Sequence, residues 1–300
     1  MTPSRWIVLL HLVLVYISWG STYLGLKLTL EVLGPFMACG ARMTLGGLLF
    51  GLYLRLAGRW RRPTAADLRH AAVFGLLMVV MASGFLSKGQ EYIDSSVAAL
   101  VSGSTPISML VAAWLFAGEE RPSAAQWLGL AGGLIGLVLL GGAHTEGGLR
   151  ADPAGVCWVL SGTFAWVGGS LVMRRRPAVT RLLPQQSCAL LLLVGGLESL
   201  LLGVLCGECS LTHWENLRPE VLLAFAWMVV GGAIFAYNSY FWLLSHVSIA
   251  TAVSYEYVVP VIGILLGWRL GGEAVNGQML LASCLTVSSV FLILRHKHDR

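Results

Sequence analysis

Two ionisable side chains fall inside apolar stretches where charge is costly. Glu256 and Arg42 each lie about seven or eight residues into a continuous hydrophobic segment. At 1.5 Å per residue, Glu256 would lie roughly 12 Å along a helix. A charged side chain near a bilayer centre costs about 2.5–3.5 kcal/mol on insertion scales. Each group must therefore be neutralised, paired or hydrated, and groups of this kind commonly mark a transport pathway.

Several interpretations of these two charges stay open. Glu256 would carry protons in a transport cycle, recognise a substrate amine, or serve as a neutral, hydrogen-bonded structural acid. Arg42 would pair with Glu256 or with Glu198, or bind a substrate carboxylate. A further alternative is that its charged end extends to the membrane interface.

Two prolines occur at matching places in apolar segments, Pro106 in "LVSGSTPISMLVAAWLFAGE" and Pro260 in "SYEYVVPVIGILLGWRLGGE". A proline inside a helix cannot donate to the carbonyl four residues earlier. The carbonyls of Ser102 and Glu256 would then lack a partner, which is costly in lipid. We expect two helix kinks here, both facing a wet interior. A purely structural kink is the alternative for each.

Other candidates for a substrate or proton pathway carry aromatic, hydroxyl or amide groups within apolar segments. Most aromatic residues in membrane proteins anchor the interface or pack, so packing is the alternative for each. The predicted pathway comprises Glu256 and Arg42 together with Tyr255, Asn238, Tyr240, Ser102, Trp19, Tyr23 and Trp166.

Motifs for other chemistry are weak or missing. "CGEC", Cys206–Cys209, would be redox-active or bind a metal only with partners, and no second C-x-x-C or histidine pair accompanies it. A structural disulfide or no role is the better interpretation. The seven histidines are scattered without H-E-x-x-H, which disfavours a membrane enzyme acting on lipids. We expect no enzyme activity, no metal and no cofactor.

The segments that position these residues are hydrophobic blocks. The chain has 300 residues, 56% hydrophobic and 12% charged, with mean hydropathy +0.75. A soluble domain carries about twice that charged fraction. Long, continuously apolar blocks predict helices rather than barrel strands. The expected class is an all-α polytopic membrane protein with ten spans: Trp6–Leu26, Pro35–Leu54, His70–Phe85, Ser95–Phe116, Trp127–Gly142, Pro153–Met173, Pro184–Leu205, Val221–Leu243, Ile249–Arg269 and Gln278–Leu294.

The positive charges predict an orientation. With the N-terminus inside, cytoplasmic segments and span ends hold 14 Lys and Arg residues, and the outer ones hold 5. This bias favours a multi-pass protein of the cell (inner) membrane with both termini cytoplasmic. The net charge of +5 is then a topology signal and not a sign of nucleic-acid binding. The short loops leave no soluble effector region, which disfavours a sensor or scaffold.

The sequence also predicts two repeats, residues 1–145 and 150–297, each with five spans. An odd number of spans requires the second repeat to be inverted relative to the first. Inverted repeats with interrupted helices are typical of secondary transporters that bind substrate at the repeat interface. Five residues recur in type 154 positions later: Ala98, Pro106, Trp114, Gly118 and Glu119.

Several segments carry a resemblance to a known family. They are "SWGSTYLGLK", "GARMTLGGLLFG" with Arg42, "SSVAALVSGSTPI", "GTFAWVGGSLV" and "VSIATAVSYEYVVPVIGILLGWRLGGE". In order and spacing they resemble the EamA family of the drug/metabolite transporter superfamily, as two repeats covering nearly the whole chain. The resemblance implies ten helices around a central cavity and export of small metabolites or drugs.

The expected function is therefore secondary transport by alternating access, with export of small metabolites, amino acids or drugs. Proton coupling, facilitated diffusion and exchange all fit the sequence. A sugar-phosphate or nucleotide-sugar exchanger is the alternative, and it would need several basic residues facing the cavity. The expected partners are a small-molecule substrate, the lipid bilayer and protons, with a monomer favoured.

Overall fold

A computed structural model describes residues 3–93, 98, 101–142, 152–175, 181–271 and 277–295. Every secondary-structure element in this part of the chain is a helix, so the predicted all-helical class is confirmed. Six helical stretches are long and apolar enough to cross a membrane, as a multi-pass protein requires. They are Arg5–Thr22, Pro35–Leu56, Ala65–Gly89, Pro153–Arg175, Pro184–Leu205 and Pro219–His246.

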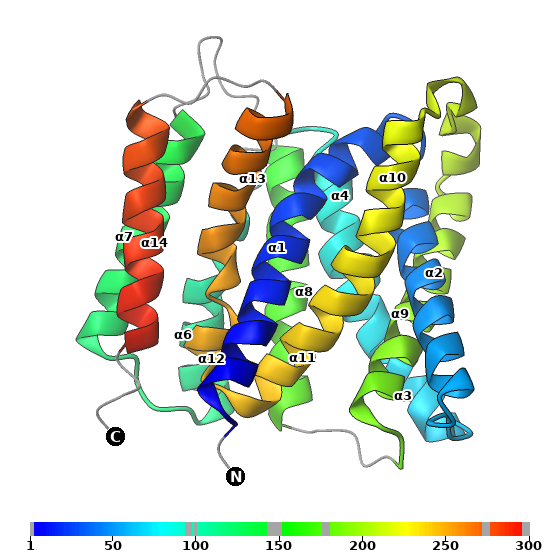
Figure 1. Ribbon diagram of the computed structural model, residues 1–300, viewed down its shortest axis with the longest axis horizontal. Helices are drawn as coiled ribbons and strands as arrows, with labels where there is room; N and C mark the ends of the chain where they lie inside the picture. The colour runs from blue at the N-terminus through cyan, green and yellow to red at the C-terminus, as the bar shows by residue number, and fades with distance from the viewer. Residues whose placement is uncertain are drawn as a thin grey trace.

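The helices follow one another along the chain with short connections, and Figure 1 shows them as one bundle. Two stretches, η1 and η4, are π-helical, and η2 and η3 are short 3₁₀ turns. The elements are α1 (Arg5–Leu30), α2 (Pro35–Leu56), α3 (Ala65–Gly75), η1 (Leu76–Gly84), α4 (Phe85–Gly89), α6 (Thr105–Ala117), α7 (Ala124–Gly142), α8 (Pro153–Arg175), α9 (Pro184–Leu205), η2 (Glu208–Leu211), η3 (Trp214–Asn216), α10 (Pro219–Trp227), η4 (Met228–Phe235), α11 (Ala236–His246), α12 (Ile249–Ala252), α13 (Tyr255–Gly271) and α14 (Gly277–Arg295).

Local sequence signals determine where several helices begin. Four helices, α2, α8, α9 and α10, open on a proline, which fits a first turn because no intrahelical donor is needed there. Helix α3 begins at Ala65, earlier than the predicted His70. The reason is a capping box in which Thr64 and Asp67 satisfy each other's backbone N–H groups.

The fourth and ninth spans differ from the continuous kinked helices that the prolines predicted. Helix α6 begins only at Thr105, after a turn, so Pro106 is its second residue. The prediction of a kink within a helix at Pro106 is wrong, because a proline in a first turn breaks no helical hydrogen bond. In the ninth span the interruption lies between Ala252 and Tyr255, ahead of Pro260, whose side chain lies outside the described part.

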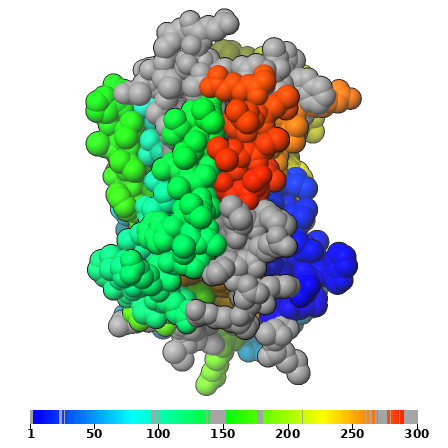
Figure 2. Space-filling view, turned by 90° about the vertical axis from the view of Figure 1, so that its left-hand side faces the viewer, coloured from blue at the N-terminus to red at the C-terminus, as the bar shows by residue number. Residues whose placement is uncertain are grey.

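Glycines allow the closest helix contact in the bundle. Helix α2 packs along α9, and a Cβ on Gly47 or on Gly196 would collide with the backbone of the other helix, at Leu193 and Thr44 respectively. Small residues permit such an approach. Helices α7 and α14 form a second close pair, seen side by side in Figure 2.

Corresponding helices of the two halves occupy corresponding places. The second helices of each half, α2 and α9, pack together, and so do α7 and α14. Likewise α1 contacts α13, and α8 contacts α6. The π-helical stretches η1 and η4 interrupt the third helical span of each half. The start of α1 and the end of α14 lie at the same end of the bundle (Figure 1). The domain bounds 1–145 and 150–297 stay a prediction.

Candidate functional site

A cavity lies between the two halves, with about 830 Å³ of empty space including its open mouth. Its lining includes Trp19, in the middle of α1, and Leu26, near the end of that helix. Its lining residues are Trp19, Thr22, Leu26, Arg42, Ala82, Ser83, Leu86, Ser87, Ser102, Thr105, Val159, Gly162, Thr163, Trp166, Tyr237, Tyr255, Glu256 and Val259.

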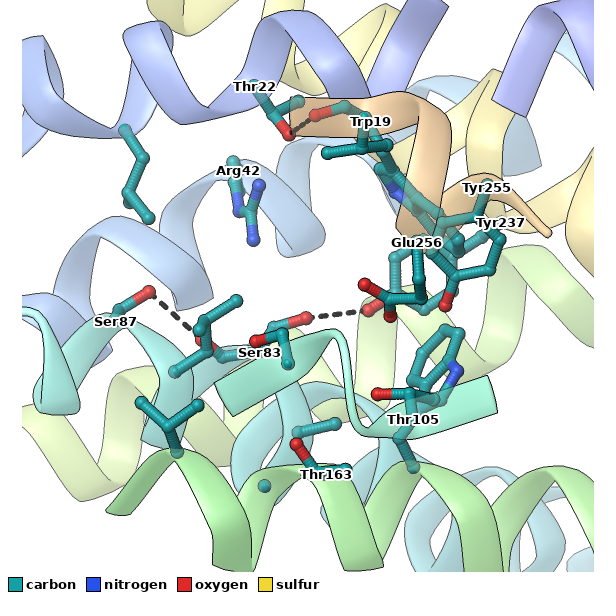
Figure 3. A pocket seen from close by; sticks show the side chains of 18 residues that line it. Trp19, Thr22, Arg42, Ser83, Ser87, Thr105, Thr163, Tyr237, Tyr255 and Glu256 are labelled. Atoms are coloured by element: carbon teal, nitrogen blue, oxygen red, sulfur yellow. Dashed lines mark hydrogen bonds between the residues drawn. The ribbon is translucent and has the colours of Figure 1, made fainter. Parts of the chain in front are cut away.

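Arg42 projects from α2 into this cavity (Figure 3). Its side chain is only 8% exposed, and its Nε atom has no hydrogen-bond partner. Among the described residues, no carboxylate oxygen lies within 4.0 Å of its guanidinium. The expected ion pairs with Glu256 and Glu198 are therefore not among the described contacts.

Glu256 reaches the same cavity from the first turn of α13, across from Arg42 (Figure 3). The side chains of Tyr255 and Thr105 are polar neighbours of its carboxyl group. Glu256 thus lies near the start of α6. Both α13 and α6 begin directly after a turn that interrupts a predicted span. A carboxyl group held by hydroxyls in a cavity can exchange protons with water that enters it.

Aromatic rings build one wall of the cavity. Trp19 lies 4.5 Å from Tyr255 and 5.4 Å from Trp166 between ring centroids, both edge to face. Its indole donates a 3.2 Å hydrogen bond to the carbonyl of Gly232. Edge-to-face packing of this kind fixes ring positions and leaves flat surfaces for an apolar ligand.

Two pairs of hydrogen-bonded hydroxyl groups lie on the side of the cavity nearer the start of α1. The Tyr16 and Ser254 hydroxyl oxygens are 2.6 Å apart, and those of Ser170 and Tyr240 are 2.8 Å apart. Farther out, His11 stacks on Trp242 at 4.2 Å. We call these two hydroxyl pairs the inner seal.

Arg174 strengthens the same end of the bundle. Its guanidinium donates to the carbonyls of Leu244 and Val247, at 2.5 and 2.9 Å, and pairs with Glu119 at 3.1 Å. One side chain thereby joins α8 to the end of α11 and to the residues after α6. At the opposite end, Asn216 and Arg218 contact Glu31, and Glu208 contacts Met37.

The segment between α9 and α10 contains an acid that the sequence analysis did not single out. Glu208, in the middle of "CGEC", is buried and accepts a 2.9 Å hydrogen bond from the Met37 N–H at the start of α2. Burial raises the pKa of Glu208, and the N–H groups of Met37 and Phe36 oppose this rise. Cys206 and Cys209 on either side are free thiols.

Most of the predicted pathway residues line the cavity, two do not, and one cannot be placed. Asn238 does not line the cavity, and Tyr240 lies below it in the inner seal, fully buried. The side chain of Tyr23 lies outside the described part. The others line the cavity: Glu256, Arg42, Tyr255, Ser102, Trp19 and Trp166.

Sequence reasoning missed several polar lining residues. Ser83 donates a 2.8 Å hydrogen bond to the Tyr237 hydroxyl, which itself donates to the Met78 carbonyl. Ser87 bonds to the Ser83 carbonyl at 2.9 Å. Their i, i+4 spacing within an apolar segment places both on one helix face, a signal that would have found them. Thr163 carries no comparable signal.

Comparison with known proteins decides the family. The sequence model described as "EamA-like transporter family" matches residues 5–142 and 153–295, which together make up most of the chain. The chain belongs to the EamA-like transporter family. This EamA protein is a membrane transporter and not an enzyme, and the predicted resemblance is confirmed.

Its relatives match along most of their length. The chain is 32% identical over 285 residues to a protein described as the uncharacterized inner membrane transporter YedA of Escherichia coli strain K12, covering 95% of this chain and 89% of that one. It is 21% identical to the uncharacterized transporter YoaV of Bacillus subtilis, covering 95% and 96%. A crystal structure of a protein with 21% identity superposes with a TM-score of 0.78, covering 99% and 100%, and shows the same fold.

Proposed function

We propose that this EamA-like transporter is a secondary active transporter of the inner membrane that works by alternating access. It exports small metabolites, amino acids or drugs. The observation that supports this most is a cavity holding two ionisable side chains, Arg42 and Glu256, with two hydroxyl pairs on the side nearer the start of α1. A site closed on one side at a time is what alternating access requires.

The proposed architecture is ten transmembrane helices in two inverted five-helix repeats, with both termini cytoplasmic. The paired contacts of α2 with α9 and of α7 with α14 support a two-fold relation between the halves. The Lys and Arg distribution supports the orientation. In this orientation the inner seal faces the cytoplasm and the cavity faces the outside.

The turns that interrupt the fourth and ninth spans provide the flexible points of the proposed transport cycle. Glu256 and Thr105 stand at the starts of α13 and α6, directly after these turns. Short helices linked by turns can rotate without breaking helical hydrogen bonds. Protonation of Glu256 would change its contacts with Tyr255 and Thr105 and so bias the two states. Proton coupling is therefore part of the proposal.

The alternative, a sugar-phosphate or nucleotide-sugar exchanger, is less well supported. Such substrates carry more than one negative charge. Arg42 is the one basic residue among the described lining residues. Export rather than uptake rests on the family resemblance.

The test is a flux assay in proteoliposomes with imposed pH gradients and a panel of candidate substrates. Wild type should move at least one substrate against its gradient when a proton gradient is present. Glu256→Gln should lose the dependence on that gradient. A wild-type protein that moves nothing in either direction would contradict the transporter proposal. Equal gradient dependence in Glu256→Gln would contradict only the coupling role.

A further inference from the structure

Arg42 is a buried cation without a described counterion. Its side chain is 8% exposed, its Nε atom has no hydrogen-bond partner, and the thiol of Cys39 is a polar neighbour. Removing a guanidinium from water without an acceptor is costly. A site built in this way is completed by an anion from outside the chain.

The two acids that the sequence suggested as counterions of Arg42 are placed elsewhere. Glu256 faces the cavity but interacts with Tyr255 and Thr105. Glu198 does not line the cavity; its Oε2 atom lies beside Gly75 on α3 and has no hydrogen-bond partner. Among the described residues, neither acid comes within ion-pair distance of Arg42.

We infer that Arg42 is the anion-binding residue of the transport site and takes the carboxylate of a small organic monoanion. This inference deepens the proposed function and rests on it. The planar guanidinium presents a fork of N–H donors that matches the two oxygens of a carboxylate. One cation balances one negative charge, so a phosphate ester with nearly two charges would leave charge uncompensated in a buried site.

The remaining lining defines the rest of the substrate. Trp19, Trp166 and Tyr255 form an aromatic wall next to the cavity that Arg42 enters. Flat apolar groups pack well against such rings. Hydroxyls from Thr22 and Ser87 add polar contacts at the cavity surface. The substrate is thus a carboxylate attached to an apolar or aromatic body.

A binding assay on the purified full chain in lipid nanodiscs tests this. The probes are phenylacetate, its neutral analogue phenylacetamide, and phenyl phosphate as the more highly charged analogue. Each is titrated while the midpoint of thermal unfolding is followed, because a ligand that binds the folded state raises this midpoint. Phenylacetate should bind wild type about ten- to a hundredfold more tightly than phenylacetamide. It should also bind more tightly than phenyl phosphate.

Three variants connect the effect to one side chain. Arg42→Gln should lose the preference for phenylacetate over phenylacetamide, and Arg42→Lys should keep part of it, because the charge remains but the fork is lost. Arg62→Gln, at an exposed arginine outside the cavity, should bind as wild type does. If Arg42→Gln does not fold, the wild-type ranking and Arg42→Lys still decide the question.

Some results would overturn the inference. These are no preference for phenylacetate over phenylacetamide in wild type, tighter binding of phenyl phosphate, or an unchanged preference in Arg42→Gln. The flux assay separates this failure from a failure of the transporter proposal. Transport of a cation that does not depend on Arg42 would leave transport intact and reject the anion site. Binding of phenylacetate through Arg42 without any flux would do the opposite.

Discussion

The Tyr16 and Ser254 hydroxyl oxygens lie 2.6 Å apart and join α1 to the break between α12 and α13. Ser254 also donates to the Thr251 carbonyl at 2.8 Å, so its oxygen accepts the hydrogen bond that the Tyr16 hydroxyl donates. The bond connects the first helix of one half to the interrupted helix of the other. Its loss would free the segment that leads directly to Glu256.

The contact between α2 and α9 should be intolerant of added volume. Gly47→Ala and Gly196→Ala each place a methyl group against the backbone of the other helix. Overpacking of this kind typically costs about 1–3 kcal/mol. Both variants should therefore unfold at a lower temperature in detergent, as followed by circular dichroism.

A third glycine gives the matched control. Gly168 lies within α8, and a Cβ there would meet nothing within 4 Å. Gly168→Ala should be neutral or stabilising by up to about 1 kcal/mol, because alanine favours helix more than glycine does. A destabilisation by Gly168→Ala equal to that of Gly47→Ala would refute the packing explanation.

Arg174 should matter more to stability than its acidic partner. Arg174→Ala leaves the Leu244 and Val247 carbonyls without their donor, at a cost of about 1–3 kcal/mol. Glu119→Ala removes only a partly exposed ion pair, worth about 0–1 kcal/mol. Thermal unfolding of both variants measures the order, and a larger loss for Glu119→Ala would show that the carbonyl contacts are unimportant.

Glu208 should make stability depend on pH. Because burial raises its pKa above the reference value of 4.5, the folded state binds this proton more tightly than the unfolded state. Its contribution is therefore greatest at pH values below 4.5 and declines as pH rises through the raised pKa. Glu208→Gln should remove this decline while keeping an acceptor for the Met37 N–H.

The measurement compares unfolding temperatures of wild type and Glu208→Gln from pH 4 to pH 8. The variant should gain stability relative to wild type as pH increases. Glu220→Gln, at an exposed glutamate in the first turn of α10, is the control and should follow wild type. A difference between wild type and Glu208→Gln that stays constant with pH would contradict the linkage.

Hydropathy predicted most of the fold because apolar length and proline positions directly constrain helices. Pro35 and Pro184 opened predicted spans and also open α2 and α9. The start of α3 was missed because a capping box, Thr64 with Asp67, extends the helix beyond its apolar core. The turns that precede α6 and α13 were not predicted. Periodicity does not reveal where a chain turns.

The site was predictable where charge or symmetry marked it. Arg42 and Glu256 were visible as charges in apolar segments, and both line the cavity. Trp19 and Trp166 also line the cavity, whereas Tyr240 belongs to the inner seal. The sequence alone does not show which face of a helix borders the cavity and which packs against another helix. Ser83 and Ser87 were passed over although their i, i+4 spacing places both on one helix face, because a serine in a helix usually bonds to its own backbone.

The central claim is that the inner seal and the outer mouth of one cavity open in alternation. A cysteine at Thr163, in a variant whose six native cysteines are replaced by alanine, reports access to the cavity. Tyr16→Phe removes one hydrogen bond of the seal, worth about 1 kcal/mol, which shifts a two-state equilibrium about fivefold. Tyr53→Phe, at an exposed tyrosine of α2, is the control.

The decisive measurement is the rate at which an impermeant maleimide labels this cysteine from each side of the membrane. Tyr16→Phe should raise labelling from the cytoplasmic side about fivefold and lower labelling from the outside, while Tyr53→Phe changes neither. An increase in labelling from both sides would indicate a continuous pore. That result, or no change at all, would contradict alternating access through this cavity.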